Sequence, residues 1–124
     1  MNDPEVTMSN APAHTDLGAA NKALDAAGDA ITLVVRVPAP LESIADQVIR
    51  SASSVPANLA EDHGRIGRNR LHLWRIACAS ANEVDCHLRL LVRAGAVDTG
   101  KAESALAMFD EVRAMTRRLL NPKT

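Results

Sequence analysis

The sequence predicts an all-α protein, an antiparallel up-down-up-down four-helix bundle, from three observations. Among its 124 residues, 47% are hydrophobic but only 2% are aromatic, and most of the apolar side chains are alanine, leucine and valine. Alanine and leucine favour helices, whereas strands are usually rich in aromatic and β-branched residues. Apolar residues recur every three or four positions in four segments, which is the helical period. Proline and glycine separate these segments by short connections, so consecutive helices are expected to run antiparallel.

The first of the four helices is expected to follow a disordered tail. Residues 1–15 are polar, contain two prolines and show no periodicity, so we assign them to the tail and residues 16–124 to the bundle domain. Asp16 can cap a helix that ends at the proline-containing segment 37–40. Its predicted buried stripe consists of Ala20, Leu24, Ala27, Ile31 and Val34.

The second helix is predicted from about Leu41 to Asp62, with a proline inside it. Its apolar stripe consists of Leu41, Ala45, Val48, Ala52, Val55 and Leu59. Pro56 cannot donate to the carbonyl of Ala52, and an interior proline costs about 3 kcal/mol in an unsupported helix. Three neighbouring serines offer hydroxyls near the freed carbonyls, so a kinked helix held by packing is one interpretation. A break with a new helix beginning at Pro56 is the alternative. Gly64 is the expected terminator.

The third helix, from about Arg68 to Ala94, carries two apolar seams. One contains Leu73, Ala77, Ser80, Val84, His87 and Leu91, and the other contains Trp74, Cys78, Ala81, Asp85, Leu88 and Val92. One stripe suffices to face a core, so two seams predict contact with two neighbouring helices or with another subunit. We assign a candidate oligomer contact to Trp74, Cys78, Ala81 and Asp85. Asp85 is a charge on an apolar seam, and we expect it to pair with an arginine across a helix or subunit contact.

The fourth helix is predicted from Thr99 to Leu120, and Pro122 stops it. Its inward positions are Ala102, Ala105, Phe109, Val112, Thr116 and Leu119. Gly95 ends the preceding helix, so the connection between the two is short.

A set of residues in the second and third helices carries a family resemblance. The set comprises Gln47, Arg50, Ser54, Pro56, Asn58, Glu61, Gly64 and Glu83, together with the segment Leu73–Ala77. It resembles the signature of the four helix bundle protein family. That family includes proteins encoded by intervening sequences in bacterial large-subunit ribosomal RNA genes, also labelled S23 ribosomal proteins. It also includes the accessory variability protein of diversity-generating retroelements.

The resemblance implies a four-helix fold and assembly with further copies of the chain into a ring-like pentamer. Through the retroelement relative it also implies RNA, DNA or RNA–DNA hybrid as a ligand and a reverse transcriptase as a partner. For Asn58 and Glu61 we expect a structural role at the end of the second helix, tying it to the third helix or to a neighbouring subunit.

Arginines are concentrated in and before the third helix, although the formal net charge of the chain is only -1. The candidate nucleic-acid-binding residues are Arg65, Arg68, Arg70, Arg75, Arg89 and Arg93. Only Glu83 and Asp85 oppose them in this segment, and the planar guanidinium suits phosphate. The functional interpretation is sequence-independent binding to a nucleic-acid backbone. The structural alternative is a solvated surface on which Arg89 pairs with Asp85 at i,i+4.

Metal, cofactor and catalytic motifs are not evident in the sequence. The histidines and cysteines (His63, His72, His87, Cys78 and Cys86) lack the short, turn-compatible spacing of zinc ligands. Ser80, Asp85 and His87 share a helix but do not converge as a nucleophile, base and orienting group would. We therefore expect no metal, no cofactor and no enzymatic activity.

Location and function follow from these expectations. The cysteines fit small core residues in a reducing cytoplasm, and no apolar run approaches the roughly 20 residues that cross a bilayer. We expect a cytoplasmic oligomer that binds nucleic acid or assists a reverse transcriptase. A structural or protein-interaction scaffold without nucleic-acid binding is the alternative.

Overall fold

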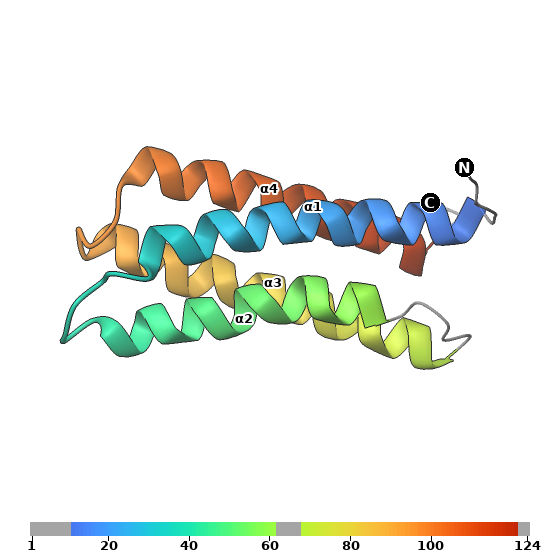
Figure 1. Cartoon of the computed structure of the whole chain (residues 1–124), viewed down its shortest axis with the longest axis horizontal. Helices are drawn as coiled ribbons and strands as arrows, with labels where there is room; N and C mark the ends of the chain where they lie inside the picture. Colours follow the sequence, from blue (N-terminus) through green and yellow to red (C-terminus); the bar gives the residue numbers. More distant parts are fainter. Residues whose placement is uncertain (1–10, 62–67, 122–124) are drawn as a thin grey trace, which may run out of the picture.

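The computed structural model confirms the predicted fold class. It describes residues 11–61 and 68–121, and within them every regular element is an α-helix. The helices are α1 (Ala11–Val34), α2 (Glu42–Glu61), α3 (Arg68–Arg93) and α4 (Thr99–Leu120). They run alternately up and down as an elongated antiparallel bundle, with the beginning of α1 and the end of α4 at the same end (Figure 1).

The helices follow one another around the bundle in chain order. α1 packs against α2 and α4, and α3 packs against the same two helices. The side of the bundle formed by α1 and α2 therefore lies opposite the side formed by α3 and α4 (Figure 1). The described helices include none that is long and apolar enough to cross a membrane.

The turn between α3 and α4 is built by local hydrogen bonds. Gly95 has a positive φ of 74° and donates its N–H to the carbonyl of Val92 at 3.0 Å, while Ala96 donates to Leu91 at 2.9 Å. This is a Schellman motif, and it requires a residue that adopts the left-handed conformation easily. Asp98 then caps α4 by accepting from the N–H of Lys101 at 2.8 Å. The prediction that the third helix ends at Gly95 is thus confirmed.

The helices contribute side chains of different sizes to the core. α1 presents small side chains: Ala19, Ala20, Ala23, Ala26, Ala27, Ala30 and Val34 are buried. The largest buried side chains come from the other helices and include Leu59, Leu88, Leu91 and Phe109. Because alanine lets backbones approach closely, α1 fits against α2 and α4 with little side-chain volume between them.

One residue of α1 that was predicted to be buried is exposed. Leu24 is 59% exposed, because the buried stripe of α1 is rotated toward Ala19, Ala23 and Ala26. The predicted stripes of the other helices mostly hold: Ala45, Val48, Ala52, Val55 and Leu59 of α2 are buried, as are Ala102, Ala105, Phe109, Val112 and Thr116 of α4.

The first helix also begins earlier than predicted. α1 starts at Ala11 rather than after a cap at Asp16, so the helix begins within the segment predicted as a tail. Pro12 falls in the first turn, where a missing N–H leaves no hydrogen bond unmade. Disorder remains a prediction for residues 1–10, which lie outside the described residues.

α2 is one helix that continues through Pro56, so the alternative of a break at this residue is wrong. Pro56 is buried. The hydroxyl of Ser51 donates to the carbonyl of Gln47 at 2.7 Å and that of Ser53 to Arg50 at 3.0 Å. The carbonyls of Gln47 and Arg50 precede that of Ala52, the carbonyl freed by Pro56, by five and two residues.

Candidate nucleic-acid interface

The two seams of α3 are both used within a single copy of the chain, since α3 packs against α2 and α4. Trp74 is only 5% exposed and Ala81 is fully buried. Neither is available to a second subunit, so the predicted oligomer contact must be corrected at these two positions. Cys78 and Asp85 are half-buried, and Asp85 lies beside α4.

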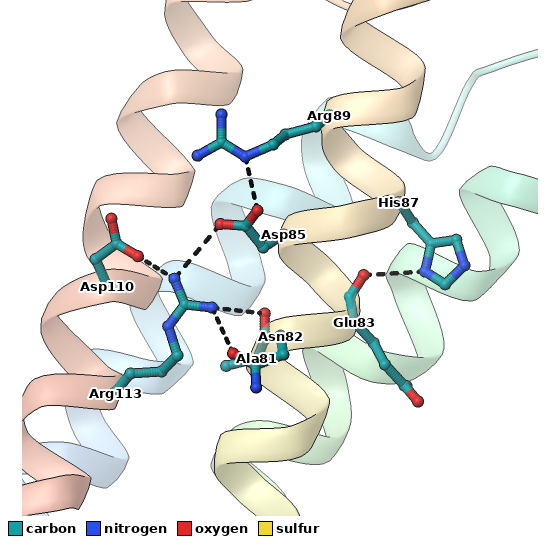
Figure 2. A network of polar contacts seen from close by, with 8 residues as sticks. All are labelled: Ala81, Asn82, Glu83, Asp85, His87, Arg89, Asp110 and Arg113. Carbon is teal, nitrogen blue, oxygen red and sulfur yellow. Dashed lines mark hydrogen bonds and ion pairs between the residues drawn. The ribbon is translucent and has the colours of Figure 1, made fainter.

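Asp85 is held by two arginines, one from its own helix and one from α4 (Figure 2). Arg89 donates from Nε to Oδ1 of Asp85 at 2.6 Å, which confirms the predicted i,i+4 pair. Arg113 of α4 places Nη2 3.4 Å from Oδ2, which supplies the arginine expected from a neighbouring helix.

Arg113 joins α3 to α4 through further contacts (Figure 2). Its Nη1 donates to Oδ1 of Asn82 at 2.9 Å and to the carbonyl of Ala81 at 3.4 Å. Its Nη2 also donates to Asp110, one turn earlier on α4. The side chain of Arg113 is only 12% exposed, and these partners occupy its fork, so its role is to organise this surface.

The arginines determine the charge state of Asp85. The hydrogen bond from Arg89 holds the pKa of the Asp85 carboxyl below its ordinary value of 3.8, against the effect of partial burial, and Arg113 adds to the lowering. The same hydrogen bond raises the pKa of Arg89. Arg89 is therefore already paired, which makes it a weaker candidate for phosphate binding than the sequence suggested.

The other predicted arginines have different surroundings. Arg65 and the side chain of Arg68 lie outside the described residues. Arg70 is half-buried, with its guanidinium 5.7 Å from the ring centroid of Trp74, a cation–π distance. Arg75 and Arg93 are exposed. Arg93 lines a small hollow with Glu103 of α4. Arg75 lies in the stretch 69–82 of α3, which contains no aspartate or glutamate.

The end of α4 adds arginines that sequence reasoning missed. Arg117 and Arg118 are exposed on the last turn of α4, which lies beside the first turns of α3 (Figure 1). Neither residues 69–82 of α3 nor residues 112–121 of α4 contain an aspartate or glutamate. We call Arg75, Arg117 and Arg118 the α3–α4 arginine surface. The sequence feature that could have identified Arg117 and Arg118 is the absence of aspartate and glutamate from the end of the fourth helix.

Arg117 stands at the edge of a hollow of about 510 Å³ between α3 and α4. The described residues that line it are Asn82, Asp85, Asp110, Arg113 and Arg117. Two aspartates line this hollow, so it is unsuited to an anion. Burial raises the pKa of the nearby Cys78 thiol, while Arg117 and Arg113 act in the opposite direction.

Three polar side chains link α2 to α3. Asn58 donates its Nδ2 to the carbonyl of Ser54 at 2.7 Å and to its hydroxyl at 2.9 Å. Ser80 of α3 donates to the same hydroxyl at 2.9 Å. Ser54 and Ser80 thus make the direct link between the two helices, and Asn58 supports Ser54 from within α2. The structural role predicted for Asn58 stays a prediction. This is the level of α2 at which Pro56 interrupts the backbone ladder.

The remaining signature residues have varied positions. Gln47, Arg50 and Glu83 are exposed, and the carbonyl of Glu83 lies 2.9 Å from Nδ1 of His87. Gly64 and the side chain of Glu61 lie outside the described residues, as does His63. Among the side chains that the structure describes, no group of three or more histidines, cysteines or acids is placed to hold a metal ion.

Fold and surface together define a small up-down-up-down four-helix bundle whose polar face lies between α3 and α4. Residues 15–118 match the sequence profile of the family described as 23S rRNA-intervening sequence protein, and the chain belongs to this family. None of the curated protein sequences matches the chain.

The fold is also seen in a solved relative. The chain is similar to the 1.70 Å crystal structure of a protein of unknown function from the S23 ribosomal protein family of Bacteroides thetaiotaomicron. The TM-score is 0.77 at 24% sequence identity, and the match covers 89% of this chain and 99% of the other. This similarity supports the fold alone.

Proposed function

We propose that this chain is a non-enzymatic, cytoplasmic and oligomeric protein that binds nucleic acid through phosphates at the α3–α4 arginine surface. The observation that carries the proposal is the presence of exposed arginines on two packed helices, Arg75 of α3 and Arg117 and Arg118 of α4, in stretches of those helices that contain no aspartate or glutamate. Guanidinium groups bind phosphate oxygens in a bidentate manner, and exposed ones lose little hydration on doing so.

The ligand is a backbone rather than a particular base sequence. The chain has no tyrosine, one tryptophan and one phenylalanine. Trp74 and Phe109 are both buried, so neither offers a face on which bases stack. RNA, DNA and RNA–DNA hybrid should therefore bind with similar affinity. The family description, which refers to a ribosomal RNA intervening sequence, supports structured RNA as the first ligand to test.

Affinity per copy is expected to be low. Three phosphate contacts correspond to a slope of roughly -2.7 in log K against log salt, from about -0.9 per contact. An oligomer repeats the surface and raises the effective concentration of arginines near one strand. The family resemblance supports a pentamer. A pentameric ring that binds the RNA–DNA hybrid made by a reverse transcriptase would act as an accessory protein of that enzyme.

A fluorescence-anisotropy titration with structured RNA and with RNA–DNA hybrid tests the proposal. Binding should weaken steeply between low and physiological salt and should be lost in the triple variant Arg75→Glu, Arg117→Glu, Arg118→Glu. A control triple variant makes the same charge change at exposed positions elsewhere in the bundle: Arg36→Glu, Arg50→Glu and Lys101→Glu. Equal loss in both variants would mean that net charge, and not this surface, governs binding.

A protein-interaction scaffold is the second candidate function, and an apolar groove between α1 and α2 favours it. Absence of binding at low salt in the titration would leave this candidate as the better account. A gene neighbourhood containing a reverse transcriptase with its repeat cassettes would favour the first.

A further inference from the structure

An apolar groove runs between α1 and α2, on the side of the bundle opposite α3 and α4 (Figure 1). Its volume is about 450 Å³, and none of the described residues that line it is ionisable. The lining residues used below are Leu24, Gly28 and Ile31 of α1 with Pro56, Ala57 and Ala60 of α2. Covering this groove is favourable, because each Å² of apolar area removed from water contributes about 25 cal/mol.

α1 contributes a continuous apolar stripe to the groove. Leu24 is 59% exposed, and Gly28 and Ile31 follow it at i+4 and i+7 on the same face of the helix. Val35 is 57% exposed and extends the stripe by a further turn, since its N–H donates to the carbonyl of Ile31 at 2.9 Å. At 1.5 Å per residue the stripe is roughly 16 Å long, which is the length of three helical turns.

α2 contributes a wall of small side chains. Ala57 and Ala60 are exposed, Pro56 is buried, and a Cβ at Gly28 on the opposite wall would meet nothing within 4 Å. Small residues allow the axis of another helix to approach to about 8–10 Å. An extended peptide would instead need unpaired backbone groups, whereas helices pair theirs internally. The groove therefore fits a third helix.

The side of the bundle formed by α1 and α2 is acidic. Among the described side chains of these two helices, the exposed ionisable groups are Asp25, Asp29, Glu42, Asp46 and Arg50. Lys22 is half-buried, and its Nζ lies 3.1 Å from Oε1 of Glu111 on α4. Four carboxylates against one guanidinium give this side a negative potential, opposite in sign to that of the α3–α4 arginine surface.

These acids stand beside the apolar stripe. Asp25 directly follows Leu24 on α1, and Asp46 lies on the stripe of α2 that runs through Arg50 to Ser53. A helix with lysine or arginine beside its apolar face would meet opposite charges here. A second copy of the chain placed face to face on this groove would instead bring like charges together. Charge complementarity therefore selects a basic partner.

We propose that the α1–α2 groove binds an amphipathic helix of a different protein, one with an apolar stripe flanked by lysine and arginine. Its apolar side chains, spaced at i, i+3, i+4 and i+7, pack on Leu24, Ile31 and Val35 and enter the space beside Gly28 and Ala57. This inference rests on the protein-interaction candidate among the proposed functions and names the class of partner. It does not rest on the nucleic-acid surface, which belongs to the other two helices.

A fluorescence-anisotropy titration of labelled model helices with the full chain tests the proposal. The first peptide carries leucines at i, i+3, i+4 and i+7 with lysines on both flanks. The second replaces the lysines by glutamates, and the third has the composition of the first in an order without an apolar stripe. The first peptide should bind and the other two should not, because only the first matches both the groove and its charge.

Substitutions in the chain locate the binding surface. Leu24→Ser and Ala57→Gln should each weaken binding of the first peptide by about tenfold. Both positions are exposed, so far-UV circular dichroism should retain the helical spectrum. Asp25→Asn combined with Asp46→Asn should weaken binding more at low salt than at physiological salt, since salt screens exposed charges. Leu90→Ser is the matched control, because Leu90 is 47% exposed on α3 and does not line the groove.

Four outcomes would overturn the proposal. The first two are absence of binding by the lysine-flanked peptide and equal binding by the glutamate-flanked peptide. The third is equal weakening by Leu90→Ser and by the groove substitutions. The fourth is a fall in particle mass by sedimentation when Leu24→Ser or Ala57→Gln is made without peptide, which would assign the groove to a contact between copies. The triple variant Arg75→Glu, Arg117→Glu, Arg118→Glu should still bind the peptide, so this proposal and nucleic-acid binding can fail separately.

Discussion

Nη2 of Arg113 lies 3.4 Å from Oδ2 of Asp85, and this contact fixes the pairing of α4 with α3. Asp85 occupies an apolar seam of α3, and the side chain of Arg113 is only 12% exposed. Each charge is partly removed from water and has a partner of opposite sign. Such a pair favours one helix register over others, since a shift of one turn would separate Asp85 from Arg113 and leave each charge only its partner on its own helix, Arg89 and Asp110.

Arg113→Met should destabilise the bundle by about 2 kcal/mol, because it leaves the carboxylates of Asp85 and Asp110 without their shared guanidinium while keeping most of the side-chain volume. Urea denaturation followed by circular dichroism measures the change. Asp85→Asn combined with Arg113→Met supplies a double-mutant cycle. If the two effects simply add, the contact between these residues does not contribute to stability.

The pH dependence of stability follows from the depressed pKa of Asp85. A carboxyl whose pKa is lower in the folded state than in the unfolded state stabilises the fold above its unfolded pKa. That contribution is lost as the pH falls through the lower, folded pKa. The free energy of unfolding should therefore decrease as the pH is taken below about 4, near the ordinary carboxyl values. Asp85→Asn should fall less steeply over this range, and parallel curves for the two proteins would contradict the assignment.

Local spacing predicted the helices well and their relative arrangement less well. The end of α3 at Gly95 and the limits of α4 were predicted because glycine, proline and apolar period agree there. The buried face of α1 was partly wrong, since alanines occupy several stripes and hydrophobicity hardly distinguishes them. Packing between the helices determines which stripe of α1 is buried, and it places the alanines inside and Leu24 outside.

The candidate site could also be predicted only in part, because spacing along the sequence identifies pairs on one helix but not contacts between helices. Asp85 was recognised as a charge in need of an arginine, but its spacing identified only Arg89 on the same helix. Arg113 comes from a helix whose register against α3 is set by three-dimensional packing. Arg117 and Arg118 were missed for the same reason, since their relation to Arg75 depends on the antiparallel pairing of α3 and α4.

Two glycines should respond in opposite ways to alanine. Gly28 lies within α1, and a Cβ there would meet nothing within 4 Å, so Gly28→Ala should stabilise the protein by about 1 kcal/mol through helix propensity. Gly95→Ala should destabilise it by a similar amount, because φ of 74° is strained for alanine. Thermal denaturation of both variants measures this contrast. A decrease in stability with Gly28→Ala would mean that the backbone at this position is not an ordinary exposed helix.

The two free cysteines should differ in their reaction with thiol reagents. Cys86 is exposed on α3, whereas Cys78 is half-buried and burial raises the pKa of its thiol. The thiolate is the reactive form, so alkylation of the native protein near neutral pH should modify Cys86 first. Mass spectrometry of peptides after brief treatment with iodoacetamide gives the order of modification. Denaturation in urea should remove most of the difference, because it exposes Cys78 and restores an ordinary thiol pKa. Faster modification of Cys78 in the native state would instead mean that the charges of Arg117 and Arg113 outweigh the effect of burial.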